Sequence, residues 1–246
     1  MAFSQDRQLE SWKSMTNPQL CRWFLFPSVQ ALQAEAAAMI ARAAEQAIAR
    51  SEAFRIVLSG GGTPRPLYEQ LRGLTTHWNA WHVYFSDERC VPADDPERNS
   101  FMAERAWLAH VPIPRRQIHT IPAERGAKAA AAAYVDTLRQ VAQFDLVLLG
   151  LGEDGHTASL FRGHDWGRKD SSPAALPVFE APKPPPERVS LSAWRLSRAK
   201  QVMFLVEGEN KREAVMNWRA GANIPARAIT PRHGVDVLAE GIVLEE

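Results

Sequence analysis

The sequence predicts an α/β fold in which a mainly parallel sheet is flanked by helices on both faces. Short apolar runs, each followed by glycines or charged residues, alternate with helical and often alanine-rich stretches along the 246 residues. Such alternation is typical of a parallel sheet covered by helices. A chain of this length can bury one sizeable core, so we expect a single domain over residues 1–246, with residues 1–19 as a candidate flexible extension.

The first elements are expected to be a strand, a long helix and two further strands. Leu20–Phe26 is rich in apolar and aromatic side chains, as strands are. The pair Pro27-Ser28 then opens an alanine-rich helix that runs to about Arg50. A short apolar run predicts a strand at Ile56–Leu58, and alternating residues predict another at Trp81–Phe85.

The rest of the chain continues the same alternation. The segment 162–186 is rich in proline and holds no clear element, so it is interpreted as a long loop. Helices are predicted at Glu97–His110, Ala127–Val141 and Asn210–Arg219, and strands at Leu146–Leu149, Arg188–Leu191, Gln201–Val206 and Arg227–Ile229.

The segment 144–161, FDLVLLGLGEDGHTASLF, carries the clearest chemical signal. Its apolar run ends in a glycine-rich turn, and a buried parallel strand presents its functional groups at the carboxyl edge of the sheet. Histidine titrates near neutral pH, so His156 is the candidate catalytic base. Asp154 or Glu153 would orient it, and the sequence leaves both open because adjacent turn residues can point opposite ways.

Two other interpretations compete for this turn. Gly150-x-Gly152-x-x-Gly155 matches the dinucleotide-binding fingerprint, and Asp170 stands where its acidic residue is wanted, about 20 positions on. Asp170 lies in a polar loop rather than at the end of a second strand, which disfavours this interpretation. The other alternative is a strand-to-helix turn in which His156 merely caps a helix.

A second turn follows the predicted strand at 56–58. The glycines Gly60, Gly61 and Gly62 can turn their backbone N–H groups toward one point, and such a nest binds phosphate or another oxyanion. Thr63 is a suitable N-cap and Pro64 suits the first helical position. The turn is not a Walker A loop, because no Gly-Lys-Ser/Thr follows, and a plain tight turn is the alternative.

A third turn follows the predicted strand at 81–85. It contains Asp87 and Arg89, with Asn99 further on. A guanidinium group binds phosphate or carboxylate through two parallel hydrogen bonds, so this turn can be a substrate clamp, or else a solvated charged turn. All three turns follow strands of one predicted sheet, and we expect them to meet at one edge.

These segments, in this order and roughly at this spacing, closely resemble the 6-phosphogluconolactonase family. SGGGTPRPLYEQL, SDERCVPADDPERN and FDLVLLGLGEDGHTASLF carry the resemblance, and PKPPPERVSLS, FLVEGENK and IPARAI resemble the family's later motifs. The resemblance covers residues 54 to 229. The related glucosamine-6-phosphate deaminases share the Asp-Gly-His core but continue differently, and Thr157–Leu160 resembles the lactonase branch.

The resemblance implies a fold shared with glucosamine-6-phosphate deaminase, ribose-5-phosphate isomerase and CoA transferases. It also implies hydrolysis of 6-phospho-D-glucono-1,5-lactone, the second step of the oxidative pentose phosphate pathway, by His-assisted attack of water and without metal or cofactor. The phosphate would be bound by cations in motif-like positions: Arg89, Lys183, Arg188 and Lys211. A covalent acyl-enzyme is not expected, because no serine lies in a Gly-x-Ser-x-Gly elbow. The alternatives are an amino-sugar-phosphate deaminase or isomerase and a non-catalytic sugar-phosphate sensor.

Composition and charge limit the kinds of partner and the cellular compartment that we expect for this chain. The net charge of +1 gives no general attraction to nucleic acid or to an anionic membrane. The apolar runs are far shorter than the roughly 20 residues of a membrane helix, and the first residues lack the layout of a signal peptide. Cys21 and Cys90 do not form a disulfide framework, which favours the cytoplasm, and Cys90 is interpreted as a small filler residue. We expect a small sugar phosphate as the partner of a monomer or small homo-oligomer.

Overall fold

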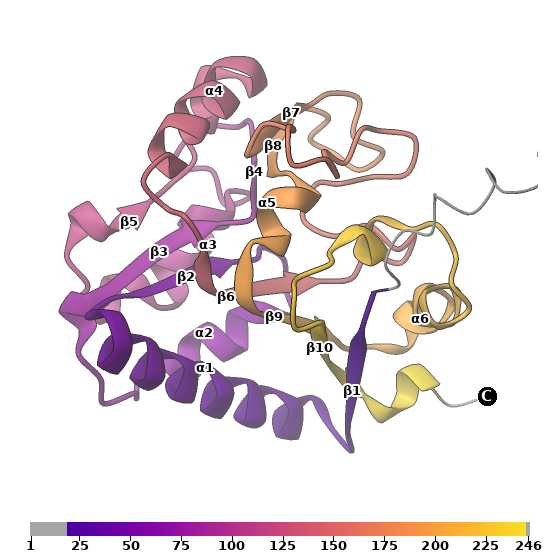
Figure 1. Ribbon diagram of the computed structural model, residues 1–246, viewed down its shortest axis with the longest axis horizontal. Helices are drawn as coiled ribbons and strands as arrows, with labels where there is room; N and C mark the ends of the chain where they lie inside the picture. Colours follow the sequence, from indigo (N-terminus) through magenta and orange to yellow (C-terminus); the bar gives the residue numbers. More distant parts are fainter. Residues whose placement is uncertain (1–18, 245–246) are drawn as a thin grey trace, which may run out of the picture.

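The computed structural model describes residues 19–244, which form two sheets (Figure 1). The larger is a seven-stranded sheet in the order β1-β10-β9-β6-β2-β3-β5, and all its neighbouring strands are parallel. The smaller is antiparallel, in the order β4-β8-β7. The strands are β1 Cys21–Phe26, β2 Phe54–Leu58, β3 Trp81–Phe85, β4 Asp87–Arg89, β5 Ile118–His119, β6 Phe144–Gly150, β7 Ala175–Val178, β8 Arg188–Leu191, β9 Ala199–Val206 and β10 Val235–Glu240.

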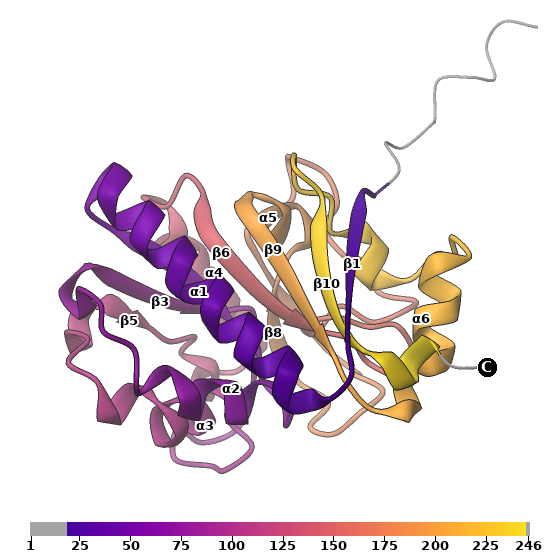
Figure 2. The same cartoon turned by 90° about the horizontal axis from the view of Figure 1, so that it is seen from below.

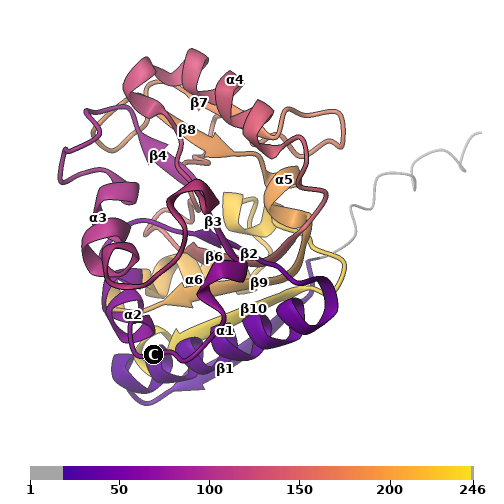
Figure 3. The same cartoon turned by 90° about the vertical axis from the view of Figure 1, so that its left-hand side faces the viewer.

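Helices cover both faces of the larger sheet, as predicted. In Figure 3, α1 and α2 lie on one face, while α4 and α5 lie on the other together with the smaller sheet. The helices are α1 Val29–Ser51, α2 Pro64–Leu71, α3 Asn99–Ala106, α4 Ala127–Leu138, α5 Ala193–Ser197 and α6 Arg212–Arg219. Short 3₁₀ turns lie at Trp78–Ala80, Leu108–His110, Arg115–Gln117, Ala123–Arg125, Glu209–Lys211, Pro225–Ala228 and Gly241–Leu244. Among residues 19–244, none of the helices has both the length and the apolarity to cross a bilayer.

Local sequence explains how α1 and α4 are attached to the sheet. Ser28 caps α1 by accepting a hydrogen bond from the Ala31 amide at 3.2 Å, and small buried alanines let the helix lie close against β2, β6 and β10 (Figure 2). Tyr134 of α4 is fully buried, and its hydroxyl accepts a hydrogen bond from the Phe85 amide at 2.9 Å. Helix α4 is thereby fixed to the end of β3, next to the third of the predicted turns.

The strand order places the predicted turns side by side. From β2 the chain moves outward to β3 and β5, whereas from β6 it moves in the opposite direction to β9 and β10. The order therefore reverses between β2 and β6, and open α/β sheets bind ligands at the carboxyl edge of such a reversal. Because β3 is paired with β2, the turns that follow β6, β2 and β3 start from adjacent strands.

One predicted strand is wrong, and some strands were not predicted. The strand predicted at Arg227–Ile229 does not form. A 3₁₀ turn at Pro225–Ala228, which begins at a proline, takes up its first two residues. The last strand is β10, which was not predicted and pairs with both β1 and β9. The segment 162–186, interpreted as a loop, contains β7. Its Pro177 is tolerated because β7 lies at the edge of the smaller sheet.

Several predicted helices are shorter than expected. The helix predicted at Glu97–His110 starts at Asn99, ends at Ala106 and is followed by a separate 3₁₀ turn. The helix predicted from Asn210 likewise begins with a 3₁₀ turn, so that Lys211 immediately precedes α6. The predicted extension 1–19 lies outside the described residues, apart from residue 19 itself.

Candidate active site

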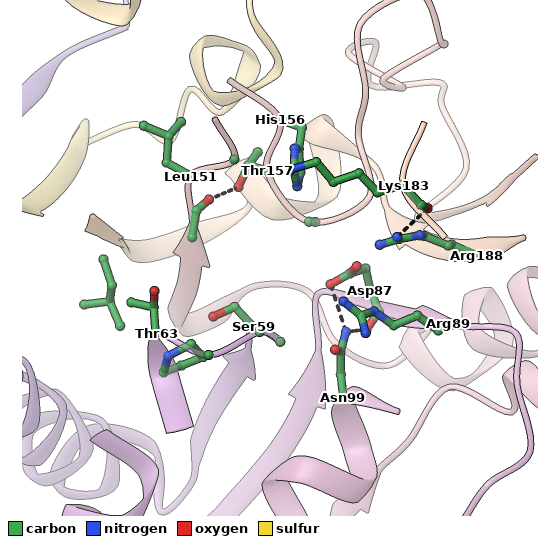
Figure 4. A pocket seen from close by; sticks show the side chains of 18 of the residues that line it. Ser59, Thr63, Asp87, Arg89, Asn99, Leu151, His156, Thr157, Lys183 and Arg188 are labelled. Carbon is green, nitrogen blue, oxygen red and sulfur yellow. Dashed lines mark hydrogen bonds between the residues drawn. The ribbon is translucent and has the colours of Figure 1, made fainter. Parts of the chain in front are cut away.

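The three predicted turns converge on one cavity of ≈ 330 Å³ at the carboxyl edge of the sheet (Figure 4). His156 lines this cleft, as does every residue that was expected to bind substrate. Those residues are Gly60, Gly61, Gly62, Thr63, Asp87, Arg89, Asn99, Lys183, Arg188 and Lys211. Asp154 and Glu153 belong to the turn that carries His156 but do not line the cleft. The expected meeting of distant loops at one edge is confirmed.

The turn after β6 pairs His156 with one of its two acidic neighbours. Nδ1 of His156 lies in hydrogen-bond contact with Oδ1 of Asp154, and the His156 amide donates to the same oxygen at 3.3 Å. Partial burial alone would raise the pKa of Asp154, but its hydrogen bond to His156 and the charge of that ring hold the pKa well below its usual range. Glu153 instead accepts a hydrogen bond from Nδ2 of Asn210 at 2.6 Å.

Packing explains the glycine spacing that imitates a dinucleotide fingerprint. A Cβ atom on Gly152 would lie 1.9 Å from Nδ1 of His156. Gly155 has a φ of +83°, and a Cβ atom there would lie 2.9 Å from the side chain of Ile224. Residues 151–174 contain no helix, whereas a fingerprint and a helix cap both require one after the strand. Both alternative interpretations of this turn are therefore wrong.

Gly152 should tolerate no side chain for the same reason. We expect Gly152→Ala to displace the imidazole and to lower kcat by about 10²-fold, the effect of a misplacement of about 1 Å. The measurement is kcat for the lactone hydrolysis that the resemblance implies, in a variant whose folding is checked by circular dichroism. Gly73→Ala is the control, because a Cβ atom at Gly73 would lie at an ordinary contact distance of 3.6 Å from the Gln70 carbonyl oxygen, and Gly73 does not line the cleft. Unchanged turnover in Gly152→Ala would contradict this prediction.

The glycine turn after β2 is shaped by the residue that packs on it. A Cβ atom on Gly60 would lie 1.9 Å from Oδ1 of Asn99, so glycine is required for this close approach. Gly61 has a φ of +91°, which also favours glycine. Pro64 is the first residue of α2, as predicted, but Thr63 has helical dihedral angles and makes no capping side-chain hydrogen bond, so the predicted cap is wrong.

Ser59 is a pocket residue that the sequence analysis did not select. It directly follows β2, lines the cleft and is buried. Within residues 19–244, its hydroxyl has no hydrogen-bond partner. Its position between the end of a predicted strand and the glycine turn is the sequence signal that could have identified it as a pocket residue.

The third turn is a buried strand rather than a solvated turn. Asp87, Glu88 and Arg89 form β4, which pairs with β8. The Asp87 carboxylate accepts hydrogen bonds from Oγ of Ser159 at 2.6 Å and from Nδ2 of Asn99 at 3.3 Å. Ser159 therefore ties the turn after β6 to β4.

Cations gather around the cleft without enough carboxylates to pair with them. Arg89 and Arg188 stand directly opposite each other in the β4–β8 pair, an arrangement that is destabilising for like charges. Burial lowers the pKa of Arg188, and the neighbouring charge of Arg89 lowers it further. Burial likewise lowers the pKa of Lys211, and Lys183 adds to this against the opposing charge of Glu153. A bound anion would relieve the repulsion in both pairs.

Other candidate groups stand apart from this chemistry. Burial raises the pKa of Cys90 to about 11, so the thiol is protonated at neutral pH and a nucleophilic role is disfavoured. His164 contacts the carbonyl oxygen of Phe179 at 3.0 Å and does not line the cleft. Across the part of the chain that the structure describes, no group of three or more His, Cys, Asp or Glu side chains is arranged to hold a metal ion.

Comparison with known proteins agrees with the motifs. The family model of glucosamine-6-phosphate isomerases/6-phosphogluconolactonase matches residues 27–238. A 6-phosphogluconolactonase of Mycobacterium tuberculosis is 36% identical over 225 residues, which cover 85% of this chain and 91% of the relative. The crystal structure of 6-phosphogluconolactonase from Thermotoga maritima superposes with a TM-score of 0.83 at 26% identity, covering 90% of this chain and 100% of the other.

A monomeric glucosamine-6-phosphate deaminase shares the fold as well. Its TM-score is 0.77 at 19% identity, with 90% of this chain and 98% of the other covered, and an identity this low supports the fold alone. The family model, the identity to curated relatives and the strand order all agree. The chain belongs to the glucosamine-6-phosphate isomerase/6-phosphogluconolactonase family.

Proposed function

We propose that this protein hydrolyses 6-phospho-D-glucono-1,5-lactone to 6-phospho-D-gluconate in the oxidative pentose phosphate pathway. The observation that carries the proposal is the cleft itself, in which an imidazole backed by a carboxylate faces a rim of cations. The lactone is an internal ester with a phosphate at its far end. It needs a general base, a group that stabilises an oxyanion and a binding site for an anion. The lactonases of Mycobacterium tuberculosis and Thermotoga maritima support the same choice.

His156 acts in both halves of the reaction. With Nδ1–H donated to Asp154, the lone pair of the ring is on Nε2, which takes a proton from the attacking water. Water adds to the C1 carbonyl carbon, and the carbonyl oxygen becomes an oxyanion. The intermediate then collapses, the bond between C1 and the ring oxygen breaks, and the imidazolium returns a proton to the leaving alkoxide. Asp154 stays ionised and stabilises the imidazolium, because its pKa is held low.

The remaining pocket residues divide between the two ends of the substrate. Backbone N–H groups of the turn Gly60–Gly62 can donate to the oxyanion, as preorganised donors do in other acyl-transfer sites. Arg89, Lys183 and Lys211 bind the phosphate, and Arg188, which also lines the cleft, stands opposite Arg89 in the β4–β8 pair. Asp87 and Asn99 are held rigidly to each other and offer polar atoms to the sugar hydroxyls.

Arg89 should make a large contribution to affinity. Its Nη1 donates to the Glu97 carbonyl at 2.8 Å, while Nε is buried without a partner among the described residues. We expect Arg89→Ala to raise KM by about ten- to a hundredfold with a smaller change in kcat, because a hydrogen bond to a charged group is lost. Arg162→Ala is the control, since this exposed arginine does not line the cleft. If KM is unchanged in Arg89→Ala, the phosphate binds elsewhere.

Substitution of Asp154 should lower kcat much more than substitution of its neighbour Glu153. Asp154→Asn removes the charge that fixes the tautomer of His156 and stabilises its protonated ring, so kcat should fall by at least about tenfold. Glu153→Gln should leave kcat nearly unchanged, because that carboxylate contacts Asn210 rather than the imidazole. The comparison uses initial rates at saturating substrate. Equal losses of kcat in the two variants would show that Asp154 is not the specific acid partner of His156.

A coupled assay tests the function itself. Glucose-6-phosphate dehydrogenase generates the lactone in place, and its disappearance is timed with and without this protein, against a blank for spontaneous opening. Acceleration supports the lactonase. Release of ammonia from glucosamine 6-phosphate would support a deaminase instead, and binding of 6-phosphogluconate without any turnover would support a sensor. A reducing cytoplasm suits the free cysteines Cys21 and Cys90.

A further inference from the structure

Arg188 uses most of its hydrogen-bonding capacity on the chain that carries Lys183. Nη2 donates to the carbonyl oxygens of Lys183 at 2.8 Å and Pro184 at 3.0 Å, and Nε donates to that of Pro185 at 3.1 Å. Arg188 as a whole residue is only 4% exposed. A guanidinium has five N–H donors, so three successive carbonyls consume the majority of them. Lys183 itself is exposed and its segment 179–187 contains no helix or strand. The ends of the segment are held by backbone hydrogen bonds from Ala181 to Pro186 and from Cys90 to Glu187, both at 3.0 Å, whereas residues 183–185 are held by Arg188.

The other end of Arg188 is joined to the turn after β6 and, through it, to β4. Its Nη1 lies 3.5 Å from Oγ of Ser159, and that hydroxyl donates to Asp87 at 2.6 Å. Asp87 in turn accepts from Asn99. One connected set of polar contacts thus fixes the Lys183 segment relative to the turn after β6 and to β4. Figure 4 shows the two ends of this set, where Arg188 meets the Lys183 carbonyl and Asn99 meets Asp87.

Arg89 provides a contrast on the facing strand. It is the cross-strand neighbour of Arg188, yet among the described residues its side chain makes a single hydrogen bond, to the Glu97 carbonyl, and keeps donors available for a ligand. The two arginines therefore have different uses despite their pairing. We propose that Arg188 is a positioning residue, which acts on the substrate by holding Lys183 in the cleft rather than through its own contact with the phosphate. This inference rests on the proposed function and deepens it.

A double-mutant cycle on KM for the lactone separates the two roles. Lys183→Ala and Arg188→Gln alone should each raise KM by about tenfold. In the Lys183→Ala background, the added Arg188→Gln change should raise KM by less than about twofold, because the contact that Arg188 supports is already absent. If Arg188 binds the phosphate directly, the two factors multiply to about a hundredfold and the proposal is wrong.

Arg188→Lys tests the same point by another route and replaces Arg188→Gln in the cycle if that variant does not fold. Lysine keeps the positive charge but cannot donate to three carbonyls at once. We expect KM to remain raised in Arg188→Lys, and a normal KM would overturn the proposal because charge alone would then suffice. Complete absence of lactone hydrolysis in the unmodified protein would instead reject the proposed function, so the two failures are distinguishable.

Arg195→Gln is the matched control for the loss of a buried arginine. Arg195 lies on α5, directly after the strand that carries Arg188. It is equally buried and donates to the Val141 carbonyl at 2.7 Å, away from the cleft. Its replacement should lower the melting temperature without changing KM. A similar rise of KM in Arg195→Gln would show that general destabilisation explains the Arg188 effect.

Discussion

Replacement of His156 by alanine should lower kcat for lactone hydrolysis by about 10²–10⁴, the usual contribution of a general base. The imidazole is held by Asp154 at one ring nitrogen, which leaves the other to accept the proton of water. The variant loses this proton transfer but keeps the cations that we expect to bind the phosphate. KM, and the affinity for 6-phosphogluconate measured by calorimetry, should therefore change far less than kcat.

The control for this experiment is His164→Ala. His164 lies in the loop just beyond the motif, where it contacts the Phe179 carbonyl and does not line the cleft. Its replacement should leave kcat close to that of the unmodified protein. Unimpaired hydrolysis by His156→Ala would reject the base assignment, and equal losses in both histidine variants would indicate a general disturbance of the loop instead.

The location of the site could be predicted because it depends on local signals and one rule of topology. Each turn after β2, β3 and β6 has its own signature in glycine or charge, and parallel strands place their carboxyl ends at one edge. The sequence did not specify that these strands are neighbours, which depends on the strand order. It also did not separate Asp154 from Glu153, because the direction of two adjacent side chains in a turn depends on packing against Asn210 and His156.

The incorrect sequence predictions share one physical cause, which is that they depend on contacts between residues distant in sequence. Gly152 suggested a dinucleotide site because a close approach to a phosphate and a close approach to an imidazole both require glycine. Asp87 and Glu88 can be a solvated turn by composition alone, and they are buried only because β8, about 100 residues further on, pairs with them. Strand β7 contains a proline and was hidden for the same reason, since its pairing with β8 compensates for its weak local propensity.

Glu88 is the clearest example of a residue whose burial depends on a segment distant in sequence. We expect Glu88→Ala to destabilise the fold by about 3–5 kcal/mol. Its fully buried carboxylate accepts hydrogen bonds from the backbone amides of Asn99 at 2.7 Å and Ser100 at 2.9 Å, at the start of α3, and pairs with Arg98 at 3.3 Å. Alanine would leave these two amides without their acceptor, and the buried Arg98 guanidinium would keep only the partly exposed Glu124, at 3.4 Å, as a carboxylate partner. For a chain of this size, we expect the melting temperature to fall by about 6–20 °C.

Urea denaturation of Glu88→Ala and Glu69→Ala measures this difference directly. Glu69 forms an exposed pair with Arg65 at 3.4 Å, so its loss should change the free energy of unfolding by less than about 0.5 kcal/mol. Because Asn99 begins α3 and packs on Gly60, folded Glu88→Ala should also show a raised KM. Equal stability of the two variants would mean that the buried ion pair contributes nothing to α3, and the rigidity of Asn99 at the cleft would then need another source.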